Sequence, residues 1–108
     1  MRFTRTESGR RRCIFIEHRA DWEVFERLVS AVTQTFAAEA GQPMYDVDMY
    51  AVSLNVAHAG VIVEVDHYQG VSVYAGSEQD DDEGFFLDVV NYLGAHAAEL
   101  GIEIERKV

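Results

Sequence analysis

Residues 50–74 decide the fold of this chain, and they read YAVSLNVAHAGVIVEVDHYQGVSVY. Apolar residues alternate there with small, polar or acidic ones, and Gly60 and Gly70 interrupt the alternation. A period of two places successive side chains on opposite faces of a strand. The stretch therefore predicts a three-stranded antiparallel meander with one valine-rich face.

The register of the meander should keep that apolar face continuous, because a slip of one residue moves every side chain to the opposite face. A four-residue loop over 57–60 pairs Leu54 with Val63. A three-residue loop before the third strand pairs Val65 with Val73, in a glycine-bulge turn. We take this as the expected register.

Two amphipathic segments flank the meander. Apolar residues recur at helical spacing and predict helices over about 21–40 and about 84–100. Asp21 is expected to cap the start of the first helix. Gly41 is expected to end the first helix, and Gly101 the second, as left-handed caps.

Further strands complete the predicted fold. Residues 13–18 are rich in β-branched and aromatic types, and residues 102–105 alternate in the same way. The expected order is β-α-β-β-β-α-β, which predicts an α+β two-layer sandwich with a mainly antiparallel sheet and both helices on one face. We expect one domain over 1–108, in which residues 1–12 form either a flexible basic arm or an edge hairpin strand.

The charges are strongly partitioned along the chain. There is no lysine or arginine between Leu28 and Glu105, a stretch that carries fourteen aspartates and glutamates. The net charge of −10 comes from that stretch, because residues 1–27 and the last three residues each contribute about +2. Such a body repels phosphates, so we expect no direct binding of nucleic acid by it.

Location is predicted from what the composition lacks. The single cysteine, Cys13, cannot form an internal disulfide, which is typical of a reducing compartment. No apolar run approaches the ~20 residues that a bilayer span needs, and no secretory signal is apparent. We expect a soluble cytoplasmic protein without membrane contact.

The first candidate binding surface is the non-core face of the meander. The expected register sets Ser53 opposite Glu64, and Glu64 opposite Tyr74, with Asp66 two residues further along. Two carboxylates beside hydroxyl groups suit a cationic ligand or a divalent metal. The same pattern is also typical of the solvated side of an antiparallel sheet.

The second candidate surface is an acidic loop over 76–84. Its carboxylates Asp80, Asp81 and Asp82 precede the second helix, where they favour the positive end of the helix dipole. They could also contact a basic protein, with Phe85 as an apolar anchor, or bind a metal. The contiguous spacing does not match a calcium loop, and the four histidines form no recognisable ligand set, so we predict no metal and no cofactor.

Function is predicted only in outline. Established catalytic motifs are missing and several aromatic residues are expected at the surface, which favours an interaction protein that binds another protein or itself. One alternative is an inhibitor, immunity-type or nucleic-acid-mimic protein for a basic partner. Another is a small-ligand or metal-dependent enzyme that uses Glu64, Asp66 and Tyr74. A basic partner is favoured if the two acidic surfaces are adjacent; if they are far apart, the charge mainly serves solubility.

Overall fold

The protein has an α+β fold, seen in a computed structural model that describes residues 2–5, 12–17 and 19–102. Its described elements are β1 (Arg2–Arg5), β2 (Arg12–Glu17), α1 (Trp22–Phe36), β3 (Glu39–Ala40), β4 (Met44–Tyr45), β5 (Met49–Val56), β6 (Ala59–Asp66), β7 (Gly70–Ala75), α2 (Asp80–Ala95) and α3 (Ala97–Leu100). Among these residues, no helix is both long and apolar enough to cross a bilayer.

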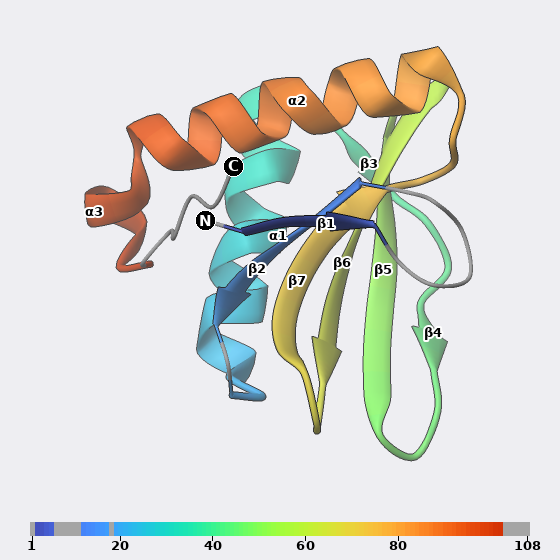
Figure 1. Ribbon diagram of the computed structural model, residues 1–108. Helices are drawn as coiled ribbons and strands as arrows, with labels where there is room; N and C mark the ends of the chain where they lie inside the picture. The colour runs from blue at the N-terminus through green and yellow to red at the C-terminus, as the bar shows by residue number, and fades with distance from the viewer. Residues whose placement is uncertain (1, 6–11, 18, 103–108) are drawn as a thin grey trace.

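The strands form one antiparallel sheet in the order β1-β2-β7-β6-β5-β3, with β4 also paired to β5 (Figure 1). The predicted meander is confirmed as β5-β6-β7. β1 pairs with β2 at one edge, so part of the N-terminal stretch is a hairpin strand. The predicted last strand lies mostly outside the described residues, and Ile102, its first residue, is in no strand.

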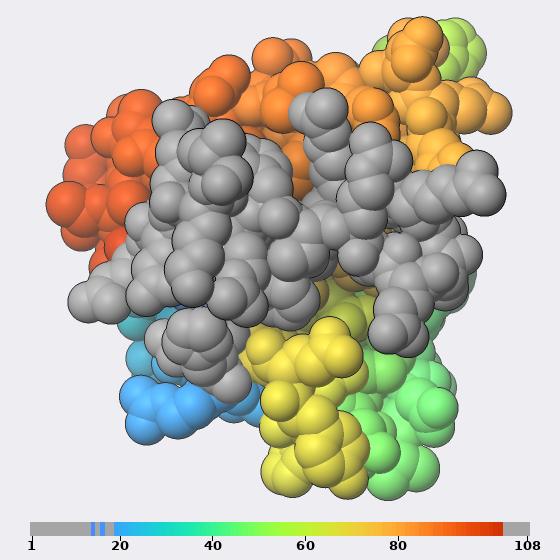
Figure 2. Space-filling view, viewed as in Figure 1, coloured from blue at the N-terminus to red at the C-terminus, as the bar shows by residue number. Residues whose placement is uncertain are grey.

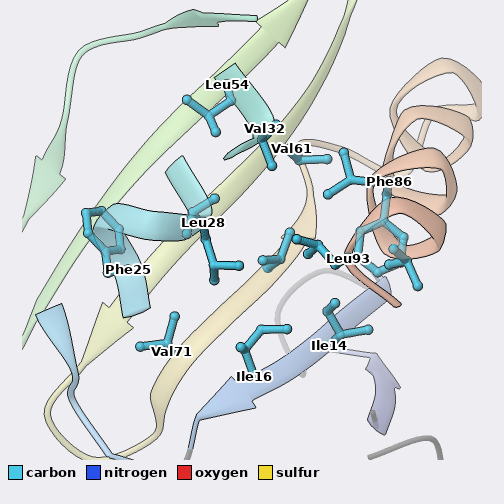
Figure 3. Close-up of a cluster of buried hydrophobic side chains, with 14 of the residues drawn as sticks. Ile14, Ile16, Phe25, Leu28, Val32, Leu54, Val61, Val71, Phe86 and Leu93 are labelled. Atoms are coloured by element: carbon cyan, nitrogen blue, oxygen red, sulfur yellow. The ribbon is translucent and has the colours of Figure 1, made fainter. Parts of the chain in front are cut away.

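The core lies between the helices and the valine-rich face of the sheet. Leu28 and Val32 of α1 and Phe86 and Leu93 of α2 are fully buried and belong to one cluster with the sheet valines. Figure 3 shows these side chains converging from both helices on the strands. Each large apolar side chain contributes roughly 1.5–3 kcal/mol when it is buried, so the predicted two-layer packing is the main source of stability.

The predicted register is wrong by two residues at both turns. Leu54 pairs with Val61 and not with Val63, because Ala57 adopts a positive φ of 53° and the β5–β6 turn needs only two residues. At the second turn, Val65 pairs with Val71. A shift of two residues keeps the side-chain parity, so the core face is the one predicted.

The predicted end of the first helix is also wrong. Asp21 caps the start as expected, because its Oδ1 accepts hydrogen bonds from two first-turn amides, at 3.0 and 3.2 Å. The helix ends at Phe36, however, with Ala37 in the left-handed region at φ 54°. Gly41 instead lies against β5, where a Cβ would overlap Ser53 Oγ. This glycine permits close approach of the edge segment to the sheet.

The second helix begins earlier than predicted. Asp80 to Glu83 form the first turn of α2 and are not part of a loop. Gln79, at the N-cap position, makes no side-chain capping bond, so the acidic first turn compensates the helix dipole. The helix ends at Ala95, and the short α3 follows it to Gly101, whose positive φ of 67° confirms the predicted cap.

Candidate functional site

The predicted pair of Glu64 and Tyr74 is in contact. The Tyr74 hydroxyl donates a hydrogen bond of 3.2 Å to Glu64 Oε1. The contact is diagonal, since the register sets Tyr74 opposite Ile62 and Glu64 opposite Ser72. Burial raises the pKa of Glu64 above its ordinary value of 4.5; the hydrogen bond from Tyr74 opposes this rise and the charge of Asp66 adds to it.

Asp66 and Ser53 do not complete a binding constellation with this pair. Asp66 Oδ1 accepts hydrogen bonds from the amides of Tyr68 and Gln69, at 2.7 and 3.0 Å, so this carboxylate holds the β6–β7 turn. Ser53 lies opposite Ile62, and its Oγ accepts from Asn55. The predicted alignment of Ser53 with Glu64 is therefore wrong, because it depended on the incorrect register.

The face that carries Glu64 differs from the solvated sheet face considered as one interpretation. Ala51, Ile62 and Ser72 lie on it, and all three are buried, with Ser72 only 4% exposed. Glu64 and Tyr74 are themselves half-buried. Solvent access to the carboxylates of Glu64 and Asp66 is therefore limited. Glu64, which is half-buried and hydrogen-bonded to the Tyr74 hydroxyl, fits a structural role as well as a binding role.

In the acidic first turn of α2, Asp82 has a structural role, whereas Asp80 and Asp81 are exposed. Asp82 Oδ1 accepts from the Gly60 amide at 2.8 Å, and Oδ2 accepts from Ser77 Oγ. Asp82 thus ties the start of α2 to the β5–β6 hairpin. Asp80 and Asp81 are exposed and line a hollow of about 430 Å3 together with His58 and Asp88.

Phe85 cannot serve as the predicted exposed anchor. It is buried, with 8% of its surface exposed, and its ring packs edge-on against Phe36 at 5.4 Å. The predicted end of the acidic loop was too late, so Phe85 occupies a core-facing position of α2. In the part of the chain that the structure describes, no group of three His, Cys, Asp or Glu side chains is arranged to hold a metal ion.

The two predicted acidic surfaces lie far apart. Gly60, which contacts Asp82, and Asp66 are at opposite ends of β6. At ~3.3 Å per residue of strand, Gly60 lies roughly 13 Å from Glu64 and roughly 20 Å from Asp66. The two surfaces are therefore separate, and they do not meet the condition of adjacency that would favour a basic partner.

A different surface carries exposed rings, and we call it the aromatic groove. It is a hollow of about 450 Å3 lined by Ala20, Trp22, residues 45–50, Val65 and His67. Its lining comes from the start of α1, from β4 and the β4–β5 turn, and from the adjoining ends of β5 and β6. In Figure 1, the start of α1, the β4–β5 turn and the β6–β7 turn all lie at the lower end of the molecule.

Three rings form the body of the aromatic groove. The centroid of Tyr50 lies 5.5 Å from that of Trp22 and 6.3 Å from that of Tyr45, and the two tyrosine rings are nearly parallel at 16°. Phe25 supports Tyr50 from the core, edge-on at 5.6 Å. Trp22 and Tyr45 remain exposed over 52% and 75% of their surfaces.

The loops around the groove are tied together and present further apolar side chains. The amide of His67 donates to the carbonyl of Asp48 at 2.8 Å, which joins the β6–β7 turn to the β4–β5 turn. We call the surface formed here the aromatic end; its exposed large apolar side chains are Trp22, Tyr45, Val47 and Tyr68. Figure 2 shows these segments side by side along the lower edge, near residues 20, 47 and 70 of the colour bar.

The comparisons with known proteins add no relative. A scan against protein-family models, a search of the curated proteins and a search of the solved structures each found no match to this chain.

The aromatic groove was missed by the sequence interpretation. β4, which holds Tyr45 beside Tyr50, was not predicted. A signal was nevertheless present, since five aromatic or histidine side chains of this region fall just outside or at the ends of predicted elements. These are Trp22, Tyr45, Tyr50, His67 and Tyr68. Ring faces and nearby carboxylates suit the binding of a ligand.

Proposed function

We propose that this protein is a binding module that takes a partner protein on its aromatic end. The observation that carries the proposal is the clustering of exposed apolar side chains. Of the six large hydrophobic residues exposed in the described part of the chain, four belong to the aromatic end; Leu87 lies on α2, and Met44 shares the opposite face of the sheet with its partner Ala51. Contiguous exposed apolar surface is typical of protein–protein contact sites.

The composition of the aromatic end supports a protein partner. Tryptophan and tyrosine are enriched in protein interfaces, because they bury much apolar area and lose little conformational freedom. Trp22, Tyr45 and Tyr68 supply these types here. The hydrogen bond from His67 to Asp48 joins two turns, and the one from Asp46 to Met49 closes the β4–β5 turn. Both keep the surface formed before a partner arrives, which lowers the entropic cost of binding.

Charge disfavours the other macromolecules that bind exposed rings. Asp46 and Asp48 line the groove, and Asp21 adjoins Trp22. Carboxylates repel the phosphates of nucleic acids and of anionic lipid head groups. They would also face each other if two copies met through the aromatic end about a twofold axis, since such a contact pairs identical surfaces.

The test compares two sets of surface variants. Tyr45→Ser with Val47→Ser removes exposed apolar area from the aromatic end, and Leu87→Ser removes a similar exposed side chain from α2. After proximity labelling or cross-linking in the source cells, we expect the wild type and Leu87→Ser to label the same partner protein and the double variant to lose it.

Three results would contradict the proposal. Equal labelling by all three proteins, or labelling of no protein, would remove the role of the aromatic end. Binding to anionic vesicles that depends on Tyr45 would assign the surface to lipid. Sedimentation that shows a Tyr45-dependent dimer would assign it to self-association.

A further inference from the structure

The aromatic groove combines two features that together select the chemistry of a ligand. Its rings present exposed π faces, and its rim carries carboxylates. Either feature alone is common at protein surfaces. Their combination within one hollow of about 450 Å3 allows a single side chain to contact both.

The ring faces are held in a fixed arrangement. Tyr45 and Tyr50 are cross-strand partners on β4 and β5, which keeps their rings nearly parallel. Trp22 is fixed as the first residue of α1 and packs against both Tyr50 and Phe25, with centroids 5.5 and 5.6 Å apart. The negative face of such a ring attracts a cation within about 6 Å of its centre.

The carboxylates on the rim are available for pairing. Asp46 Oδ1 accepts from the amide of Val47 at 2.7 Å, which leaves its second oxygen for a ligand. Among the residues that the structure describes, the carboxylate of Asp48 has no hydrogen-bond or ion-pair partner. Arg19 precedes the lining residue Ala20 in the sequence and has an interaction partner of its own. From residue 20 to 102 the chain has one lysine or arginine, Arg27, which already contacts Glu23 and the Leu100 carbonyl.

We infer that the aromatic groove binds an arginine side chain on an exposed segment of the partner protein. The guanidinium stacks on the faces of Trp22 and Tyr45 while its N–H groups donate to Asp46 and Asp48. Arginine fits better than lysine, because its planar group stacks on rings and still directs several donors to carboxylates. The inference rests on the proposed function and names the chemistry of the partner that the groove recognises.

The single tryptophan makes the groove directly observable. Trp22 is the only tryptophan of the chain, so the intrinsic fluorescence reports on the groove. The probe is an acetylated and amidated peptide of glycine and serine with three arginines. Matched peptides carry lysine or citrulline at the same positions, and citrulline keeps the planar shape of arginine without its charge.

The expected result is a saturable change of Trp22 fluorescence with the arginine peptide. The lysine peptide should bind at least threefold more weakly, and the citrulline peptide should give no saturation. Binding should weaken as salt is raised from 20 to about 200 mM, because the contact is partly electrostatic. Tyr45→Ala and the pair Asp46→Asn with Asp48→Asn should each weaken binding at least tenfold.

A matched variant separates the groove from the overall charge. The pair Asp80→Asn with Asp81→Asn also removes two negative charges, but from the hollow beside α2 at the other end of β6. We expect this variant to bind the arginine peptide within twofold of the wild type. Circular dichroism and urea midpoints show that each variant is folded. An asparagine side chain at position 46 can still accept a hydrogen bond from the amide of Val47.

The opposite results would overturn the inference. It fails if the two paired variants weaken binding equally, if lysine and arginine peptides bind alike, or if Trp22 fluorescence does not saturate. Failure here leaves the proposed function standing if the labelled partner still depends on Tyr45 and Val47. The converse result is that the arginine peptide binds in the groove while Tyr45→Ser with Val47→Ser labels the partner as well as the wild type does. That result would overturn the proposed function and retain the groove as a binding site for arginine.

Discussion

Replacing Asp82 with alanine should destabilise the protein far more than the same change at Asp81. Both residues lie in the first turn of α2 and face the same helix dipole. Of the two, only Asp82 accepts hydrogen bonds within the described residues, from the Gly60 amide and from Ser77 Oγ. The comparison therefore isolates the link between the helix and the β5–β6 hairpin.

The magnitude follows from those contacts. A hydrogen bond to a charged group contributes about 1.5–3 kcal/mol, and the Gly60 amide is left without an acceptor in a partly buried position. Allowing for solvent and relaxation, we expect Asp82→Ala to lower the free energy of unfolding by about 3 kcal/mol. In a domain of this size, that lowers the melting temperature by roughly 12–20 °C. Asp81→Ala should cost no more than about 1 kcal/mol, the usual limit for a charge at an exposed helix end.

Thermal and urea unfolding followed by circular dichroism measure both effects. Asp82→Asn serves as an intermediate case, because its amide oxygen can accept from Gly60 while its NH2 donates to Ser77. If Asp82→Ala melts within about 3 °C of Asp81→Ala, the carboxylate does not hold the helix to the hairpin, and the structural assignment of Asp82 is refuted.

Four further substitutions test other parts of the fold. Glu64→Gln should raise the urea midpoint at pH 7, because burial raises the pKa of Glu64 and the folded state disfavours its charge. The wild type loses stability as the pH rises from 4.5 through the raised pKa of the folded state. The difference in urea midpoint between the two proteins should therefore vanish below pH 4.5. Ala37→Gly should stabilise the protein by roughly 0.5–1 kcal/mol in thermal unfolding, since Ala37 holds a left-handed φ of 54°; a lower melting temperature would contradict this. Gly76→Ala should cost about 1–3 kcal/mol, because its Cβ would lie 2.9 Å from the Gly60 carbonyl oxygen, whereas Gly84→Ala in α2 meets nothing within 4 Å and should stabilise the helix by about 1 kcal/mol. Equal melting temperatures for these two glycine variants would refute the close approach at Gly76.

The faces of the meander were predictable from the sequence, but its register was not. Alternation decides which side of a strand meets the core, and a shift of two residues preserves that choice. Valine therefore faces valine both in the expected and in the observed pairing. The difference lies in the turn, where Ala57 takes a positive φ that the sequence does not favour for alanine.

The predictions of where the helices begin and end were wrong for related reasons. Gly41 was assigned as the cap of the first helix, but its lack of a side chain serves the approach to Ser53 on β5. At the second helix, the run of aspartates resembled a loop in composition, although carboxylates also stabilise a first turn. Local composition cannot separate these alternatives, because tertiary contacts such as that between Asp82 and Gly60 decide them.

The candidate sites show the same limit more strongly. The contact of Tyr74 with Glu64 exists, but Phe85 is buried and Ser53 lies two positions out of register. The aromatic groove depends on β4, a strand of only two residues that forms by pairing with β5. Such a strand has no periodicity of its own, so no sequence pattern indicated that Tyr45 would stack beside Tyr50.

The excess of negative charge becomes informative once the carboxylates that the fold itself needs are set aside. Asp21, Asp66 and Asp82 accept backbone amides, so their carboxylates are needed for the fold. Those of Asp48, Asp80 and Asp81 have no such partner within the described residues, and they flank two hollows at opposite ends of the molecule. Carboxylates line both hollows, but exposed tryptophan and tyrosine rings line only the one beside Asp48. Carboxylates alone hold a cation weakly in water, whereas a ring face adds an attraction that depends on shape. This difference is why we place recognition in the aromatic groove and assign the acidic start of α2 to folding and charge balance.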